Sequence, residues 1–180
     1  QLILQPDGCR EKGECILGDN FGYIDKRNIG WEVDKGDKTD GASIPRWAQI
    51  FAGEPFEPTY LPAAVLHDHY SKSVRPVRGW YQTQVMFHEV LIASGVSKEK
   101  AALLFAGVLI GSGKWIEAEA GKPCPTLQGF SCINVEGETE TVLVTQEPIF
   151  GSEEYKQSLA KLTDEIITRG VTDPIPIVEI

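Results

Sequence analysis

The chain has 180 residues, of which 42% are hydrophobic and 24% are charged, and its formal net charge at pH 7 is -9. This composition is typical of a soluble globular protein, and residues 1–180 are predicted to form a single domain. The acidic balance argues against nucleic acid as a partner, because phosphate contacts require clustered Lys and Arg. No apolar run reaches the roughly 20 residues that span a bilayer, so no transmembrane segment is predicted.

The first predicted strands lie near the N-terminus, after an irregular polar segment over residues 1–20. Phe21–Asp25 and Gly30–Val33 are short strands separated by turn residues, which is typical of an antiparallel hairpin. A loop is expected at Asp40–Pro45, and Ser43 can cap a short helix that ends at Gly53.

Helical signals dominate the rest of the chain. An N-cap, an apolar face and a terminating glycine recur at the predicted helices. These helices start near Thr59, at Trp80 (to Ala93), at Lys98 (to about Ile110) and after Ser152 (to Gly170). The fold class is therefore α+β and mainly helical: short N-terminal antiparallel strands pack on a bundle of about four helices, with disulfide-stapled loops.

Three segments near the C-terminus are predicted to lie outside these helices. Residues 117–141 form a Gly- and Glu-rich excursion, and Val142–Thr145 is a candidate strand. Residues 173–180 alternate Ile and Pro, which predicts an extended tail.

The four cysteines form two local pairs in loops: Cys9 with Cys15, and Cys124 with Cys132. Neither pair has the spacing that is typical of a zinc site. Two loop disulfides would favour a secreted or periplasmic location. Reduced cysteines in a cytoplasmic protein are the alternative, since four cysteines allow three pairings and the sequence does not choose.

A candidate site is centred on His67 and Asp68, an ionisable pair in an otherwise aliphatic helix. Adjacent helical residues point about 100° apart, so Asp68 is poorly placed to orient His67. On the next helix Gln84 and His88 share one face, and antiparallel packing would bring both to His67. Asp40 can reach the same place from its loop.

Two chemistries fit this cluster. In one, His67 is a general base that deprotonates water, while Asp68 helps to hold a cation that stabilises an oxyanion. In the other, His67, His88 and a carboxylate from Asp40 or Asp68 bind Zn²⁺. A purely structural hydrogen-bond network is the alternative to both.

Three segments of the sequence resemble a protein family associated with phages and bacteria, the domain of unknown function 1353. These segments are Asp40–Arg46, Ala63–Asp68 and Phe87–Val96. The resemblance covers roughly residues 21–115, so residues 1–20 and 117–180 are interpreted as additions to the family core. The family has no settled activity. The resemblance therefore implies a fold and the location of a site, and no reaction.

The chain also has a more distant similarity to secreted prokaryotic phospholipases A2. That similarity implies that His67 is the base, Asp68 a Ca²⁺ ligand and Gln84 the group that orients His67. Two positions depart from both patterns: Ser71 stands where Tyr is expected, and Gln84 stands where Asp is expected. A Gln can hold a His, but it does not stabilise an imidazolium by charge.

The sequence thus predicts an exported hydrolase of bacterial envelope components, a phospholipid ester or a peptidoglycan amide, assisted by Zn²⁺ or Ca²⁺. The predicted catalytic residues are His67, Asp68, Asp40 and Gln84, and the predicted metal ligands are Asp68, His67, His88 and Asp40. The alternative is a non-catalytic binding or interaction module with a protein partner, in which the His-Asp network serves the structure.

Overall fold

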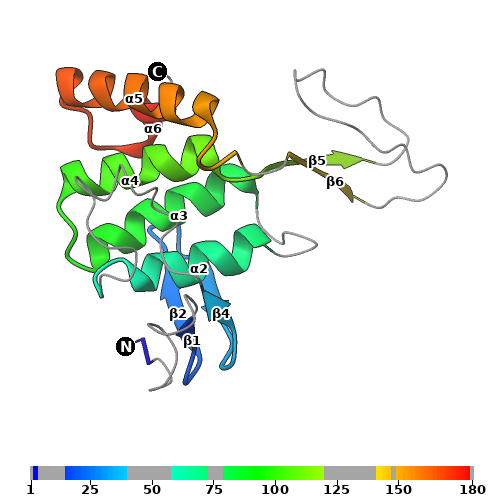
Figure 1. Cartoon of the computed structure of the whole chain (residues 1–180). Coiled ribbons are helices and arrows are strands. Elements are labelled where there is room, and N and C mark those ends of the chain that lie inside the picture. Colours follow the sequence, from blue (N-terminus) through cyan, green and yellow to red (C-terminus); the bar gives the residue numbers. More distant parts are fainter. Residues whose placement is uncertain are drawn as a thin grey trace.

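The computed structural model describes residues 2–3, 15–39, 58–72, 79–119, 141–146 and 149–178. Within these ranges the helices follow one another as a stack, from α5 and α6 through α4 and α3 to α2, and the N-terminal strands lie beyond α2 (Figure 1). The described part of the chain is therefore mainly helical with short antiparallel strands, as predicted. The loop at Asp40–Pro45 and the short helix after Ser43 lie outside the described residues.

Two short antiparallel pairs make up the N-terminal strands. The predicted hairpin is confirmed, with Phe21 opposite Val33 in its register. A second pair, in which Cys15 lies opposite Thr39, was not predicted, because two-residue strands carry no periodicity of their own. The strands are β1 (Cys15–Ile16), β2 (Phe21–Ile24), β3 (Gly30–Val33) and β4 (Lys38–Thr39).

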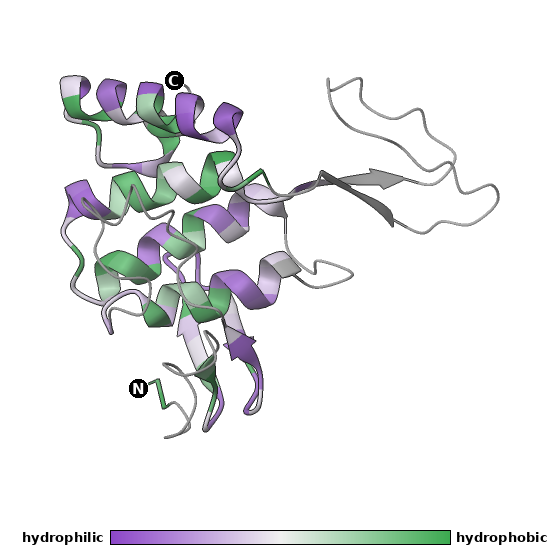
Figure 2. Cartoon of the chain, in the orientation of Figure 1, coloured by the Kyte–Doolittle hydropathy of each residue, from purple (hydrophilic) through white to green (hydrophobic). Residues whose placement is uncertain are grey.

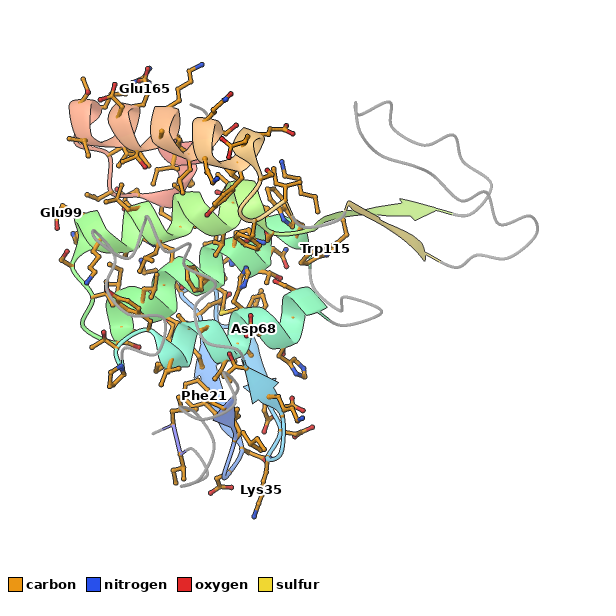
Figure 3. All side chains as sticks on the ribbon, in the orientation of Figure 1. Phe21, Lys35, Asp68, Glu99, Trp115 and Glu165 are labelled. Atoms are coloured by element: carbon orange, nitrogen blue, oxygen red, sulfur yellow. The ribbon has the colours of Figure 1, made fainter. Side chains whose placement is uncertain are left out.

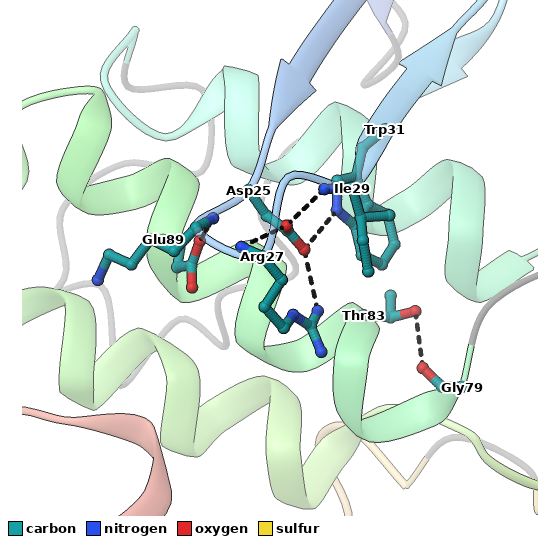
Figure 4. A network of polar contacts seen from close by, with 8 residues as sticks. Asp25, Arg27, Ile29, Trp31, Gly79, Thr83 and Glu89 are labelled. Atoms are coloured by element: carbon teal, nitrogen blue, oxygen red, sulfur yellow. Dashed lines mark hydrogen bonds and ion pairs between the residues drawn. The ribbon is translucent and has the colours of Figure 1, made fainter.

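The hairpin turn is organised by the buried carboxylate of Asp25 (Figure 4). It accepts hydrogen bonds from the backbone N–H groups of Arg27 and Ile29, both at 2.9 Å, and from the indole N–H of Trp31 at 3.1 Å. The Arg27 guanidinium adds an ion pair at 2.9 Å. Burial alone would raise the pKa of this carboxyl, but the hydrogen bonds outweigh burial and lower the pKa. Asp25 is thus a buried charge whose partners among the described residues all lie in the hairpin, in the turn and at the start of β3.

The four predicted helices are present, and a fifth short one follows them. The sequence-predicted caps are confirmed for α4 and α5: the Ser97 side chain accepts from Lys100 N, and the Ser152 side chain accepts from Tyr155 N. Gly170 ends α5 in the left-handed conformation, with φ of 64°. The helices are α2 (Leu61–Lys72), α3 (Trp80–Ala93), α4 (Lys98–Gly111), α5 (Glu153–Arg169) and α6 (Pro174–Val178).

The prediction of an extended tail was wrong, because residues 174–178 form α6. Proline is tolerated in the first turn of a helix, where its missing N–H has no partner to lose. The short helix is held by tertiary packing: Ile177 is buried in the same cluster as Ile166 of α5. Burial against α4 and α5 therefore overrides the extended preference of the Ile-Pro alternation.

Helix α4 lies between two apolar clusters. Ala101 and Leu104 belong to the cluster that α2, α3 and the strands build, whereas Phe105 and Leu109 belong to the cluster shared with α5. The apolar stripe of α5 faces α4, and its polar face points outward (Figure 2). A helix that is apolar nearly all round is expected in such a central position.

A two-stranded ribbon projects from the helical stack (Figure 1). Strand β5 (Lys114–Glu119) pairs antiparallel with β6 (Thr141–Gln146), with Lys114 opposite Gln146. The strand predicted at Val142–Thr145 is confirmed as part of β6. Its partner β5 was missed, since residues from 117 onward were expected to be irregular.

Of the four cysteines, one lies within the described residues. Cys15 is buried in β1 and is disulfide-bonded, whereas Cys9, Cys124 and Cys132 lie outside the described residues. Both predicted pairings, and the stapled loops that depend on them, therefore stay predictions. In the described ranges no helix is both long enough and apolar enough to cross a membrane.

The packing of α4 on α5 gives a test of the fold at Gly111. A Cβ at Gly111 would overlap the ring of Phe150 and lie 2.6 Å from a ring carbon of Tyr155. We expect Gly111→Ala to lower the free energy of unfolding by about 1–3 kcal/mol, because overpacking forces neighbouring side chains out of their rotamers. Urea denaturation measures this change.

Gly107→Ala, one turn earlier on α4, is the matched control. Its Cβ would meet only the Tyr155 hydroxyl, at 3.3 Å, and alanine gains about 1 kcal/mol of helix propensity over glycine. The Gly107 variant should therefore be no less stable than wild type. Equal losses in both variants would contradict the described packing.

Candidate functional site

The candidate site lies where α2 packs against α3 on one side and against β3 and β4 on the other. His67 and Asp68 are both in α2, and each is only 6% exposed. Because adjacent helical residues point about 100° apart, the two side chains serve different neighbours. His67 contacts α3, whereas Asp68 contacts β4.

His67 makes its main contact with Gln84 of α3. Nε2 of His67 lies 2.9 Å from Oε1 of Gln84, and the imidazole packs on the ring of Phe87 at 5.1 Å between centroids. The predicted contact between His67 and Gln84 is therefore present. Either imidazole tautomer can use it, since an amide offers both an acceptor oxygen and a donor nitrogen.

Asp68 is tied to the end of β4. The Thr39 hydroxyl donates to Oδ2 of Asp68 at 2.6 Å, a length typical of a hydrogen bond to a charged acceptor. Asp68 lies on the part of α2 nearest the strands (Figure 3). Asp40 itself lies outside the described residues, but it follows Thr39 directly in the chain. The described residue that immediately precedes the loop motif, Thr39, therefore contacts Asp68.

His88 does not join this site, and its predicted position was wrong. Its ring packs edge-on against Phe105 of α4, at 5.7 Å between centroids, and it hydrogen-bonds the backbone of Thr172 ahead of α6. The physical reason is that α3 is covered on two sides. A residue four places after Gln84 is rotated by about 40°, which turns His88 toward the α4 side.

Electrostatics at His88 favour the neutral ring. Burial lowers the pKa of His88 below its ordinary value, and the positive charge of Lys26 lowers it further. The Thr172 carbonyl and the Asp173 charge act in the opposite direction but do not cancel the effect of burial. Since Nε2 of His88 is buried without a partner in the described part of the chain, the bond to Thr172 is assigned to Nδ1–H.

The predicted metal ligands are not assembled within the described residues. No group of three His, Cys, Asp or Glu side chains that could hold a metal ion occurs among them. The Zn²⁺ site that combined His67 with His88 is not supported, because His88 faces α4. A cation held by Asp68 together with Asp40 stays a prediction.

Gln84 leaves one polar atom unpaired. The residue is 0% exposed, and its amide nitrogen has no hydrogen-bond partner among the residues that the structure describes. A buried unpaired donor costs about 1–3 kcal/mol, which is uncommon in native proteins and calls for an explanation. The unpaired nitrogen belongs to the same carboxamide that contacts His67.

Sequence reasoning missed two contributors to the site, Thr39 and Ser71. Ser71 Oγ lies 3.3 Å from Nε2 of His67. The signal for it was available, since residues four apart share one face of a helix. Thr39 carried no signal beyond its place before the loop motif.

His69, the remaining histidine, belongs to the surface rather than the site. Its Nδ1 lies 2.7 Å from Oδ2 of Asp37, and both side chains are more than a third exposed. Its neighbour on the other side is Tyr70, whose ring it meets edge-on. His69 therefore offers a matched control for changes at His67.

Comparison with known proteins identifies the family. The model of the family described as "Protein of unknown function (DUF1353)" matches residues 16–108, about half of the chain. The chain belongs to the DUF1353 family. The match includes Thr39, His67, Asp68, Ser71 and Gln84, whereas the β5–β6 ribbon and α5 and α6 follow it.

Two curated relatives from Sinorhizobium fredii are similar to the chain. Uncharacterized protein y4iH is 42% identical over 122 residues, which cover 68% of this chain and 49% of the relative. Uncharacterized protein y4jT is 32% identical over 99 residues, which cover 55% of this chain and 29% of the relative. The DUF1353 chain thus spans about half of the first relative and less than a third of the second. No solved structure matches it significantly.

The burial of His88 predicts a pH dependence of stability. Because the pKa of His88 is lowered in the folded state, the unfolded chain binds more protons as the pH falls through the ordinary histidine pKa of about 6.5. Wild type should therefore lose stability relative to His88→Gln as the pH falls from 7 to 5. Urea denaturation of both proteins across this range measures the difference, in which other titrating groups cancel. A difference that is constant or grows in favour of wild type would contradict the described environment.

Proposed function

We propose that this DUF1353 protein is a hydrolase of bacterial envelope components, a phospholipid ester or a peptidoglycan amide, with His67 as its general base. The observation that carries the proposal is the convergence of separate segments on the His67–Asp68 pair. Gln84 of α3 holds His67 at 2.9 Å, and Thr39 at the entrance to the loop motif holds Asp68 at 2.6 Å. A buried ionisable pair that is held from two sides is a candidate functional site.

The chemistry follows from the arrangement at His67. A general base needs a ring nitrogen within hydrogen-bond reach of the attacking group, and a second contact that fixes the ring. Gln84 and the Phe87 ring restrict the orientation of the imidazole. Proton removal from the attacking hydroxyl or water is the step that His67 would perform. Asp68, the next residue of α2, contacts β4, so it would favour the imidazolium that forms only through its charge.

Other features of the chain favour export and an envelope substrate. A disulfide-bonded Cys15 is in keeping with an oxidising compartment, and the predicted pairing of Cys124 with Cys132 would add to it. The phospholipid ester is proposed from the resemblance of the His67–Asp68 motif to that of secreted phospholipases A2. Phospholipid ester and peptidoglycan amide both remain within the proposal.

Replacement of His67 tests the proposed reaction. Wild type should release fatty acid from vesicles of phosphatidylethanolamine and phosphatidylglycerol, or amines from purified peptidoglycan sacculi. His67→Ala should lower that rate by at least about a hundredfold, because positioned proton transfer contributes roughly 10²–10⁴-fold. His69→Ala, two residues away on the surface, should leave the rate unchanged. If wild type hydrolyses neither substrate, the proposed function is wrong.

A second function, a non-catalytic binding module, is favoured by one observation. The partner of His67 is a neutral amide, and His67, Asp68 and Gln84 are all buried. A network of this kind is sufficient to fix α2 against α3 and β4, and it needs no catalytic role. In that case wild type shows no turnover, and His67→Ala lowers the melting temperature much more than His69→Ala.

Asp68→Asn tests the predicted assistance by a cation. If Asp68 and Asp40 hold Zn²⁺ or Ca²⁺, the purified wild type should retain the ion through dialysis, and Asp68→Asn should lose it, because a neutral amide oxygen binds a hard cation more weakly. Asp37→Asn removes a surface carboxylate that pairs with His69 and should retain the ion. Elemental analysis by mass spectrometry measures the content. Equal metal content in wild type and Asp68→Asn would contradict a ligand role for Asp68.

A further inference from the structure

Helix α3 carries two buried polar atoms without a partner, and the two atoms belong to neighbouring side chains. They are the amide nitrogen of Gln84, which is 0% exposed, and Nε2 of His88, which is 5% exposed; neither has a hydrogen bond in the described part of the chain. Residues four apart are neighbours on the surface of a helix. A helical side chain leans over the turn that precedes it, which brings the His88 ring toward Gln84.

The hydrogen bond between His88 and Thr172 decides what the unpaired nitrogen of His88 can do. A backbone carbonyl only accepts, so the ring nitrogen that faces Thr172 carries a proton. With Nε2 unpaired, this nitrogen is Nδ1. Burial lowers the pKa of His88, so the ring is neutral at pH 7. Nε2 of His88 is therefore an acceptor, whereas the unpaired amide nitrogen of Gln84 is a donor.

The other end of the Gln84 carboxamide decides the tautomer of His67. Oε1 of Gln84 lies 2.9 Å from Nε2 of His67, and an oxygen acceptor at this distance requires a proton on Nε2. Ser71 Oγ, 3.3 Å from the same nitrogen, can share that proton as a second acceptor. In this tautomer Nδ1 of His67 carries no proton. Nδ1 is then the nitrogen that can take a proton from an attacking group.

We propose that His88 is a positioning residue for this site: through one internal water molecule it holds the Gln84 carboxamide in the orientation that protonates Nε2 of His67 and leaves Nδ1 as the base; this rests on the hydrolase function proposed above. The water accepts from the amide nitrogen of Gln84 and donates to Nε2 of His88. Internal water commonly joins buried polar atoms that do not reach each other directly.

All links of the resulting chain point in one direction. His67 donates to Gln84, Gln84 donates to the water, the water donates to His88, and His88 donates to the carbonyl of Thr172. The reverse direction would require the backbone carbonyl to donate, which it does not do. Thr172 therefore sets the direction of the whole chain. Thr172 follows the part of the chain that matches the family model, residues 16–108, so an added segment fixes which nitrogen of His67 works.

Nitrogen NMR of the imidazole rings tests the proposal in wild type, because the protonated and unprotonated nitrogens of a neutral ring differ widely in chemical shift. The measurement is made on the full isotope-labelled chain at a pH where the rings are neutral. His67 should carry its proton on Nε2 and His88 on Nδ1, so the two buried histidines should be opposite tautomers. A proton on Nδ1 of His67 would overturn the proposal without any variant, including the case in which a variant does not fold.

Two substitutions of His88 test the coupling. His88→Phe keeps a ring against Phe105 but has no nitrogen, so His67 should become a mixture of both tautomers. His88→Gln can still donate to Thr172 and accept from the water, and it should restore the pattern of wild type. His69→Ala, on the surface of the same helix as His67, should leave the His67 tautomer unchanged.

Hydrolysis rates give a second readout. The kcat of His88→Phe should be roughly tenfold below wild type, within the range for coupled residues of one hydrogen-bond network. KM should be unchanged, because His88 is buried away from the His67 ring and touches no substrate. His88→Gln should recover most of the lost rate, whereas a purely structural role for the ring would not be rescued by an amide.

The two readouts separate this proposal from the function on which it rests. If the tautomers behave as expected but wild type hydrolyses neither envelope substrate, the hydrolase function is wrong and the orientation of His67 by His88 is confirmed. If wild type is active and His88→Phe changes neither the His67 tautomer nor kcat, His88 does not position the site. Failure of His88→Gln to restore the tautomer would also overturn the proposed chain.

Discussion

The hydrogen bond between His67 and Gln84 is the contact on which the candidate site depends. It joins two buried polar side chains across the interface between α2 and α3, and loss of either would remove a buried hydrogen bond from the other. A buried polar pair of this kind restricts how the two helices can rotate or slide, because apolar contacts alone tolerate small shifts. With His67 turned toward α3, the helical repeat turns Asp68 toward β4, where Thr39 holds it.

The C-terminal helices α5 and α6 stabilise this arrangement by packing on α4. The family match ends at residue 108, near the end of α4, and α5 then covers the face of α4 that points away from the site. His88 connects the two parts, since it leaves α3 on the α4 side and bonds the backbone of Thr172. The described segments after residue 111 therefore hold α3 and α4 in place without contributing a described side chain to the His67 cluster.

Local signals explain most of what the sequence predicted correctly. Caps at Ser97 and Ser152 and the stop at Gly170 were readable because capping is decided within a few residues. The contact of His67 with Gln84 followed from helical spacing and antiparallel packing. The two wrong predictions depend on tertiary packing. Whether His88 faces α2 or α4 depends on which helix covers that side of α3. The Ile-Pro tail becomes helical because Ile177 is buried.

Ser71 and Gln84 meet at one atom of the site. Ser71 and Gln84 are 13 residues apart in the chain, yet both contact Nε2 of His67. A carboxylate at position 84 would stabilise an imidazolium by charge, and a bulky aromatic residue at position 71 would cover the ring. The amide of Gln84 and the hydroxyl of Ser71 instead surround Nε2 of His67 with neutral hydrogen-bonding groups. Of these two residues, Ser71 is partly exposed. Two neutral side chains therefore fix the position of this ring nitrogen, and any charge that stabilises an imidazolium has to come from elsewhere in the site.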